Sequence, residues 1–272
     1  MSHTVCGTGT TVTTNGGKLV VVGSLPPLPT YKWSTSVESS MLKEDGYSSV
    51  DTVGDVIFRW STDPFSYMTQ MNGLYAGYGT IDDFRNVAYT YNVWNGHPCM
   101  SDAGQVCNGV HTQYGICVDG GYKTVFVAYR ITGTPAPNQP LFSLGAFCMR
   151  ILPDDTTKVG SDTMSPPVEV PLGTNGTVCV LGIQFALSGS DTDFAYIGTD
   201  DASVTRVQNV WFTGSTPAGP DDVQLLILGF LPLHPDYRSP AMEWYEVRYY
   251  AMNTLTDQDM IKIRNEMKAQ FA

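Results

Sequence analysis

From residue 122 to residue 230 the chain is a series of short apolar stretches parted by clusters of Gly, Pro and Asp. In the stretch YKTVFVAYRIT, Val125 and Val127 alternate with Phe126 and Ala128, which is the two-residue period of a β-strand. Similar stretches follow at nearly regular spacing: PLFSLG, AFCMRIL, TVCVLGIQFAL, FAYIGT, SVTRVQNVWF and DVQLLILGF. Short strands at such spacing predict an antiparallel sandwich or jelly roll. No internal repeat of about 20 to 50 residues is visible, which argues against a propeller or a solenoid.

The net charge of the chain indicates which classes of binding partner to expect. Lys and Arg number 15 and Asp and Glu number 26, so the formal net charge is −11. Because an acidic surface repels phosphate groups, we expect no nucleic-acid partner and no docking on anionic lipid. The sequence contains no run of about 18 apolar residues, so no membrane insertion is expected. Neutral sugars, cations and other proteins remain as partners.

The N-terminal sequence predicts a separate hairpin. Two β-rich runs surround the turn sequence NGG at residues 15–17, and three prolines between residues 26 and 29 favour an extended linker. We therefore interpret residues 1–28 as a hairpin arm with a Pro-rich linker, and residues 29–272 as the main domain. The alternative is that this hairpin forms an edge of the main sheet.

The end of the chain predicts a helix that packs on the sheet. Thr256 is a good N-cap, and Asp259 three residues later can complete a capping box. Leu255 before the cap and Met260 after it have the spacing of a hydrophobic staple. The apolar stripe of this helix comprises Met260, Ile263, Met267 and Phe271.

This strand and helix resemble the closing segment of a known family. The sequence EVRYY at residues 246–250, followed by LTDQD at 255–259, is similar to the end of the laminin-G-like jelly-roll branch of the concanavalin A-like lectin/glucanase superfamily. Three earlier stretches resemble this family in the same order: YKWSTS with GDVIFRW, then WNGHPCM, then YKTVFVAYRITGTPAPNQPLFSLG. The acidic residue that is common after the family's first Trp is absent here.

The resemblance covers about residues 31 to 271 and implies two curved antiparallel sheets, often with glycan binding on the concave face. The expected fold is therefore an all-β, two-sheet antiparallel jelly-roll sandwich with a C-terminal α-helix.

Glucanases of this superfamily carry the strand motif E-x-D-x-x-E or E-x-D-x-E, and the chain contains neither. Glu243 and Glu246 are three residues apart, so on a regular strand they would face opposite sides of the sheet. Common hydrolase and phosphate-binding motifs are also missing from the sequence. We therefore expect a non-catalytic protein, with a glycoside hydrolase as the alternative.

Aromatic residues crowd a long stretch that has no regular period. Aromatic rings stack on the apolar faces of sugars, and they also anchor protein interfaces. The alternative is that they fill the core beneath a long loop. The candidate ligand-binding residues are Tyr75, Tyr78, Tyr89, Tyr91 and Trp94.

Two acidic turns offer oxygen atoms to a metal ion. Asp200 and Asp201 in GTDDAS could bind calcium, and Asp191 and Asp193 in SGSDTDF have the same potential. The alternative is that both are polar turns between strands, since Asp and Gly are common turn residues. Calcium is thus a possible cofactor, with Asp200 and Asp201 as its candidate ligands.

The cysteines and histidines match no common zinc spacing. Cys148 and Cys179 lie in apolar strand patterns and are expected to be buried thiols. The remaining candidates lie close together in the sequence, where the simpler interpretation is loop residues with one disulfide at most: His97, Cys99, Cys107, His111 and Cys117.

Taken together, these patterns favour a non-catalytic, lectin-like recognition or display module. We expect it to be a surface, decoration or attachment component of a larger assembly such as a virion or phage, with a glycan or host-surface ligand and with protein partners. The first 17 residues lack the basic and apolar regions of a secretory signal, so the expected location is extracellular or on a virion surface without a recognisable signal peptide. The alternatives are a purely structural capsid or assembly protein, and a glycan-active hydrolase.

Overall fold

The structure is a computed structural model, and part of the chain is described in it. No helix among the described residues is long and apolar enough to cross a membrane. The described residues are 10–15, 18–24, 26–36, 40–43, 48–57, 59–61, 67–70, 89–101, 110–112, 122–144, 147–161, 164–165, 167–186, 192–212, 226–229, 241–251 and 254–272.

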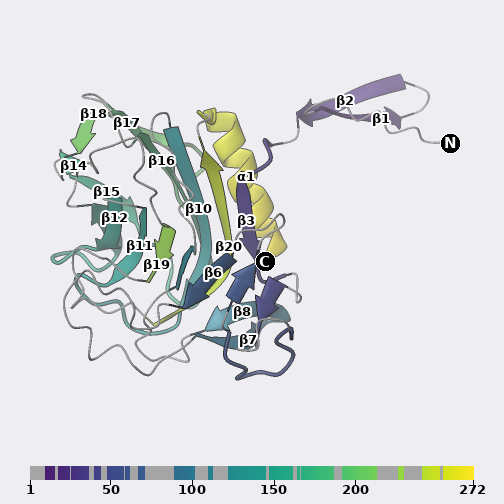
Figure 1. Cartoon of the computed structure of the whole chain (residues 1–272). Helices are drawn as coiled ribbons and strands as arrows, with labels where there is room; N and C mark the ends of the chain where they lie inside the picture. The colour runs from purple at the N-terminus through teal and green to yellow at the C-terminus, as the bar shows by residue number, and fades with distance from the viewer. Residues whose placement is uncertain are drawn as a thin grey trace.

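Two antiparallel sheets face each other, and one helix covers the outer face of the first sheet (Figure 1). Within the described residues each sheet has nine strands, and a separate two-stranded hairpin precedes them. This arrangement confirms the predicted all-β sandwich with a C-terminal α-helix. The helix is α1, Asp257–Gln270.

The first sheet is built around two strands of ten residues, β10 (Tyr122–Ile131) and β20 (Met242–Ala251), which pair from Lys123 to Ile131 of β10. β3 (Tyr31–Ser34) also pairs with β20. In spatial order the sheet comprises β14 (Met164–Ser165), β18 (Thr205–Phe212), β17 (Thr192–Ile197), β16 (Val178–Ala186), β10, β20, β8 (His97–Ser101) and β7 (Thr90–Trp94).

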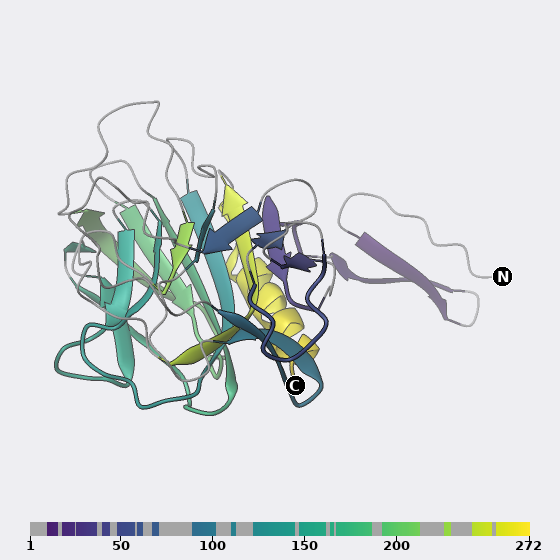
Figure 2. The same cartoon turned by 60° about the horizontal axis from the view of Figure 1, so that its bottom comes forward.

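The second sheet is made of shorter strands and lies across the core from the first (Figure 2). In spatial order it comprises β15 (Val168–Pro171), β13 (Lys158–Ser161), β12 (Phe147–Ile151), β11 (Pro140–Leu144), β19 (Leu226–Leu228), β9 (Val110–Thr112), β6 (Tyr67–Gln70), β5 (Arg59–Ser61) and β4 (Met41–Leu42).

Side chains of both sheets interdigitate in the space between them. Phe147 of the second sheet stacks on Phe185 of the first, with ring centroids 4.0 Å apart. Tyr129 and Trp244, on the paired central strands, add two more large buried rings. Burying aromatic side chains of this size is the main favourable contribution to folding, so the core holds the two sheets together.

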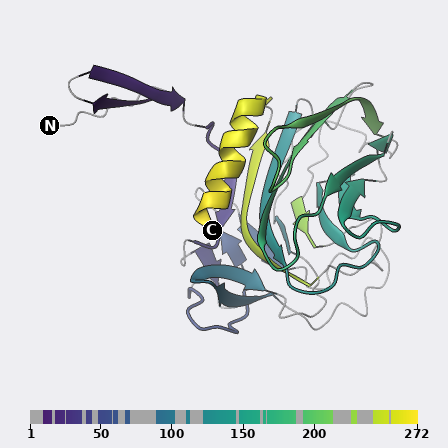
Figure 3. The same ribbon diagram turned by 180° about the vertical axis from the view of Figure 1, so that it is seen from behind.

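The C-terminal helix has the cap and the buried stripe that the sequence predicts. The Thr256 hydroxyl accepts a hydrogen bond from the Asp259 amide at 3.2 Å, and Asp259 Oδ2 accepts one from the Thr256 amide at 3.1 Å. These two bonds satisfy amide groups that a helix start otherwise leaves unpaired. The buried stripe consists of Met260, Ile263, Met267 and Phe271, and it packs against Phe126, Val180 and Ile197 of the first sheet. Figure 3 shows from behind how the helix lies along this sheet.

The N-terminal hairpin consists of β1 (Thr10–Asn15) and β2 (Lys18–Ser24). Within the described residues these strands pair only with each other. All three views draw the hairpin apart from the sandwich, at the far end of the Pro-rich linker (Figure 1, Figure 2 and Figure 3). The domain division after residue 28 remains a prediction.

Candidate functional site

The strand β20 carries a β-bulge at its centre. Against β10, Ala128 lies opposite Glu246 whereas the next residue, Tyr129, lies opposite Trp244. Tyr245 is therefore the additional residue, and a bulge of this kind redirects the side chains on one side of it. The bulge also marks the point at which the other edge of β20 changes its partner from β8 to β3.

Thr35 joins the three strands at the bulge. Its amide donates to Tyr245 O at 2.9 Å, and its buried hydroxyl lies 2.6 Å from Pro98 O and 2.9 Å from the same Tyr245 oxygen. The backbone carbonyls that the change of partner would otherwise leave without donors are thus satisfied by one residue. Thr35 therefore stabilises the bulge through these hydrogen bonds.

Because of the bulge, Glu243 and Glu246 lie on the same face of the sheet. Glu243 accepts a hydrogen bond from the Tyr245 hydroxyl, and the Tyr245 ring packs on Phe271 at the end of α1. Glu246 accepts one from Gln270 of the same helix. The prediction that the two carboxylates face opposite sides was wrong, because it assumed a regular two-residue alternation.

Glu243 is the centre of a buried polar cluster. Its side chain is 2% exposed, and its Oε2 accepts from the Tyr245 hydroxyl and from Arg130 Nε, both at 2.7 Å. Arg130 Nη2 also lies 2.7 Å from this oxygen, and Asn92 Nδ2 donates to Oε1 at 3.2 Å. A buried carboxylate needs such partners, because removing a charge from water is costly unless it is paired.

Trp94 lies over this cluster at the tip of the β7–β8 hairpin. The Arg130 guanidinium carbon is 4.4 Å from the centroid of the Trp94 ring, which is cation–π geometry. The Trp94 side chain is half-buried. Asn95 and Gly96 form the hairpin turn with φ of 49° and 79°, which is the backbone that an Asn-Gly pair favours. The hairpin and the ion pair together fix the position of a partly exposed aromatic ring.

The electrostatics of this cluster keep Arg130 charged and the Cys99 thiol neutral. Burial alone lowers the pKa of Arg130, but its interactions with Glu243, and after them those with Tyr245, together outweigh burial and raise this pKa. Burial, and after it the negative charge of Glu243, raises the pKa of the Cys99 thiol. Burial likewise raises the pKa of the Tyr245 hydroxyl, so it remains a hydrogen-bond donor.

The Glu246 carboxylate also forms ion pairs with cationic side chains. Its Oε1 accepts from Arg248 Nε at 2.5 Å, and its Oε2 lies 3.4 Å from Lys32 Nζ and 3.1 Å from Gln270 Nε2. Arg248 also pairs with Glu266 of α1 at 2.9 Å. Burial lowers the pKa of Arg248, but the charges and hydrogen bonds of Glu246 and Glu266 together raise it, so Glu246 has a permanent positive partner.

The five aromatic residues that were predicted to bind a ligand do not share one environment in the structure. Tyr89 and Tyr91 are 1% and 7% exposed and belong to the core, and Trp244 Nε1 donates to the Tyr89 hydroxyl at 3.2 Å. Their placement favours the alternative that they fill the core. Tyr75 and Tyr78 lie outside the described residues. Among those described, Trp94 alone combines an aromatic ring from this set with partial exposure.

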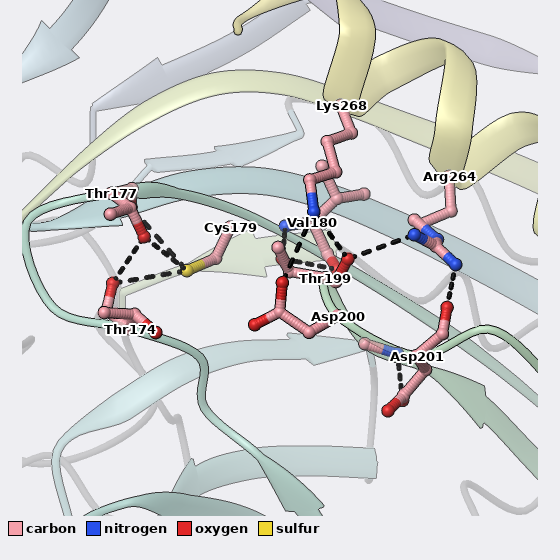
Figure 4. Close-up of polar contacts among 10 residues, drawn as sticks. Thr174, Thr177, Cys179, Val180, Thr199, Asp200, Asp201, Arg264 and Lys268 are labelled. Carbon is pink, nitrogen blue, oxygen red and sulfur yellow. Dashed lines mark hydrogen bonds and ion pairs between the residues drawn. The ribbon is translucent and has the colours of Figure 1, made fainter.

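The predicted calcium turn between β17 and β18 is held by α1 (Figure 4). Arg264 Nη1 and Lys268 Nζ donate to Thr199 O at 3.0 and 3.1 Å, and Lys268 Nζ also lies 3.3 Å from Asp200 Oδ1. Asp201 Oδ2 accepts from the Gly198 amide at 2.7 Å. A calcium ion would have to displace these donors. Calcium binding at Asp200 and Asp201 remains a prediction.

The other metal-capable residues are dispersed. Among the described residues no three His, Cys, Asp or Glu side chains come together in a way that could hold a metal ion. His97 packs edge-on against Phe271, with ring centroids 5.9 Å apart. Cys99, Cys148 and Cys179 are buried free thiols, which confirms the prediction for the last two. The structure does not describe residues 102–109, 113–120 and 187–191, nor the side chains of residues 111 and 193.

Sequence reasoning missed Arg130 and Glu243 as a pair and named neither as a site residue. The signal for them was weak, because each is a single charge inside an otherwise apolar strand pattern. A charged residue at such a position is rarely buried without a partner. Two such positions of opposite sign, one in each long strand, indicate a buried ion pair.

Comparison with known proteins adds information on the fold. No protein-family model and no curated protein sequence matches this chain. A Trypanosoma rangeli sialidase in complex with 2,3-difluoro-KDN is similar in structure, with a TM-score of 0.52 and 11% identity over 93% of this chain and 34% of the sialidase chain. A GH54 α-L-arabinofuranosidase soaked with a cyclic sulfate inhibitor has a TM-score of 0.55 and 9% identity over 89% of this chain and 63% of its own.

A further arabinofuranosidase structure, complexed with arabinofuranosyl-α-1,2-xylobiose, has a TM-score of 0.53 and 11% identity over 89% of this chain and 63% of its own. The chain thus spans between one third and just under two thirds of the solved proteins that it resembles. At identities this low the likeness concerns the fold, and each enzyme's activity belongs to that enzyme.

Proposed function

We propose that this chain is a non-catalytic, lectin-like recognition module of the concanavalin A-like type that binds a neutral carbohydrate. The observation that carries the proposal is Trp94, a half-buried ring held in place by the Arg130–Glu243 ion pair. Aromatic rings fixed in this way are suitable platforms for the apolar face of a sugar. Asn92 and Arg130 lie beside the ring and could supply polar contacts to sugar hydroxyls.

The state of the two carboxylates supports a role without catalysis. A glycosidase needs one carboxyl group as a nucleophile or base and a second as an acid, placed on either side of the scissile bond. Here Glu243 is held by Arg130 and Tyr245, and Glu246 is held by Arg248 and Lys32. Carboxylates bound in this way would have to break ion pairs before they could act on a substrate.

We further propose that the module is displayed by a larger assembly, such as a virion or phage, and acts outside the cell. The acidic net charge of −11 and the N-terminal hairpin, which stands apart from the sandwich, support this interpretation. The hairpin would fix the module to its assembly, and the sandwich would present Trp94 to a ligand.

The test is binding of the purified protein to a broad glycan array, with and without calcium. Hits that Trp94→Ala removes and that Tyr122→Ala retains would support a carbohydrate site at this ring. Tyr122 is a suitable control because it is also a half-buried aromatic residue, at the opposite end of β10. A blank array in both conditions would overturn the lectin-like proposal in favour of a purely structural protein.

A second candidate function is glycan hydrolysis, because the bulge places Glu243 and Glu246 on one face. Incubation with candidate polysaccharides, followed by analysis of released sugars, distinguishes it from simple binding. If the wild type releases sugars and Glu243→Gln or Glu246→Gln does not, the protein is an enzyme. Circular dichroism verifies that both variants are folded. Bound but uncleaved glycan would support the recognition module.

A further inference from the structure

Two Asn-Gly pairs lie in turns that the structure describes in full. One is Asn95-Gly96, at the tip of the β7–β8 hairpin, and the other is Asn175-Gly176, in the turn before β16. Both asparagines are exposed, and the φ angles of the two glycines are similar, 79° and 81°. A Cβ atom built at either glycine would have nothing within 4 Å, so crowding does not distinguish the pairs. They differ in their hydrogen bonds.

An asparagine that precedes glycine is prone to lose its side-chain amide group. The glycine amide nitrogen attacks Cγ of the asparagine, and glycine has no side chain to hinder this approach. A bond forms between this nitrogen and Cγ, the bond from Cγ to Nδ2 breaks, and Nδ2 leaves as ammonia with the proton of the glycine amide. Water then opens the cyclic imide at either carbonyl group. The product is aspartate or isoaspartate, each with a new negative charge.

Two backbone carbonyl groups protect the Asn175-Gly176 pair from this reaction. The Gly176 amide donates to Ile131 O at 2.9 Å, so the attacking nitrogen is hydrogen-bonded. Asn175 Nδ2 donates to Gly133 O at 2.8 Å, so the leaving group is held as well. The reaction at Asn175 therefore requires a local opening that breaks both hydrogen bonds.

The Asn95-Gly96 pair has neither protection. In a two-residue hairpin loop with positive φ at both positions, the loop amides are not part of the ladder between the strands. Among the described residues, the Gly96 amide and the Asn95 side chain have no hydrogen-bond partner. The attacking nitrogen and the leaving group of this pair are thus both accessible without a local opening.

The Trp94 side of this hairpin is held less firmly than the His97 side. β8 also pairs with β20, and the His97 ring packs edge-on against Phe271 with centroids 5.9 Å apart. β7 is the edge strand, and its end near Trp94 pairs with β8 alone among the described residues. Isoaspartate at residue 95 adds one atom to the main chain of a two-residue loop, which disrupts the pairing of Trp94 with His97. The displacement therefore falls on Trp94, whose ring lies 4.4 Å from the Arg130 guanidinium carbon.

We propose that Asn95 is a deamidation site of this protein, and that isoaspartate at this position moves the Trp94 ring away from Arg130. The modification converts a fixed aromatic ring into one without its cationic partner, and the fraction of modified chains increases with age. The chemistry at Asn95 is independent of the proposed function. Its consequence for ligands rests on that function: where Trp94 contacts a sugar, modified chains bind the carbohydrate more weakly.

Incubation of the full chain near neutral pH, followed by peptide mass spectrometry at successive times, tests the modification. We expect Asn95 to be converted at least about tenfold faster than Asn175, because Asn175 reacts only after its two hydrogen bonds break. Electron-transfer fragmentation distinguishes isoaspartate from aspartate. In denaturing urea the two rates should become similar, since both asparagines then precede an unprotected glycine amide. Equal rates in the folded protein, or a faster reaction at Asn175, would overturn the proposal.

The variant Asn95→Gly tests whether the modification moves Trp94. Glycine is suitable at both positions of this loop and has no side-chain amide, so the variant keeps the hairpin and cannot be deamidated there. Tryptophan fluorescence of aged wild type should be quenched more strongly by acrylamide than that of fresh protein. Aged Asn95→Gly and aged Trp94→Phe should show no such increase. Wild type that contains isoaspartate at residue 95 but shows unchanged quenching would contradict the displacement of the ring.

Glycan-array binding of fresh and aged protein separates this inference from the proposed function. We expect hits of the fresh wild type to weaken as isoaspartate accumulates at residue 95, and hits of Asn95→Gly to persist. Hits that fully modified chains retain would refute the consequence for binding. A blank array for the fresh protein would overturn the proposed function alone, because the conversion of Asn95 and the displacement of Trp94 are measured without a ligand.

Discussion

Glu243 and Glu246, three residues apart on β20, lie on the same face of the first sheet, and each is bound by an arginine. Glu243 pairs with Arg130 on the neighbouring strand, and Glu246 pairs with Arg248 on its own strand. The bulge at Tyr245 produces this arrangement. The helix α1 covers part of this face. The Arg130–Glu243 pair with Trp94, and the Arg248–Glu246 pair, lie on the same face.

Replacing Arg130 by Met should destabilise the protein strongly, because Glu243 would remain as a buried charge without its cation. We expect the free energy of unfolding to fall by about 3 kcal/mol. Urea denaturation measured by circular dichroism gives this value. The double variant Arg130→Met/Glu243→Gln should recover part of the loss, since the buried charge is then removed.

The matched control for this ion pair is an exposed one. Lys158 lies 3.0 Å from Glu169, and both side chains are well exposed. Lys158→Met should leave the free energy of unfolding nearly unchanged, because solvent screens exposed pairs. Equal losses for Arg130→Met and Lys158→Met would show that burial of Glu243 does not determine the strength of its pair.

Gly182→Ala should destabilise the first sheet, because a Cβ atom at this position would lie 2.2 Å from Cε1 of Phe126. The Phe126 ring cannot move freely, since it packs edge-on against Tyr250 with centroids 6.1 Å apart. We expect a loss of about 1 to 3 kcal/mol in the free energy of unfolding. Thermal and urea denaturation check this value.

A second substitution separates the clash from a general effect of removing glycine. Phe126→Leu should relieve part of the loss caused by Gly182→Ala, because it makes space beside the new methyl group. Gly176 has open space around its Cβ position but a φ of +81°, so Gly176→Ala should cost about 1 to 2 kcal/mol through backbone strain. Phe126→Leu should give no relief for that variant.

The sequence was sufficient to predict the sandwich and the closing helix, since both depend on local periodicity and capping. Thr256 and Asp259 form the expected box, and Met267 lies on the expected buried stripe. The bulge could not be predicted, because β20 is buried on both faces and nine of its ten residues are buried. A strand without exposed positions gives no alternation from which an additional residue could be recognised.

The candidate site could be predicted only in part. Trp94 was identified as a candidate ring, but Arg130 and Glu243 come from strands that are distant in sequence. Their approach depends on the order of β7, β8, β20 and β10 in the sheet, which no local pattern contains. Arg264 was also missed as a buried residue, because its burial depends on carbonyl groups of a distant turn, Thr199 O among them.

Removing the cap of α1 should have a moderate effect on stability. Thr256→Ala deletes the hydroxyl that accepts from the Asp259 amide, and the free energy of unfolding should fall by about 1 kcal/mol. Thr254→Ala, at an exposed position just before the helix, is the control and should be nearly neutral. If both variants lose the same amount in urea denaturation, the capping box does not stabilise the helix as proposed.

Asp55, in the segment that runs alongside β7, should make the stability of the folded protein depend on pH in acid. Its Oδ2 accepts from the amides of Asp51 and Thr52 at 3.1 and 3.0 Å and lies 3.1 Å from Lys43 Nζ. The hydrogen bond from the Asp51 amide, then that from Thr52 and the Lys43 contact, lower the pKa of Asp55 from 3.8 to about 2. Because the folded-state pKa is depressed, the contribution is complete above pH 3.8 and is lost as the pH falls toward 2.

Asp55→Asn should therefore flatten the decrease in stability between about pH 4 and pH 2, because its side chain no longer takes up a proton there. Urea denaturation at several pH values in this range measures the slope, and NMR titration of the Asp55 carboxyl measures its pKa directly. Asp154→Asn removes one carboxylate from another exposed turn and controls for the change in net charge. A wild-type slope in Asp55→Asn would show that its hydrogen bonds to the Asp51 and Thr52 amides do not persist in solution.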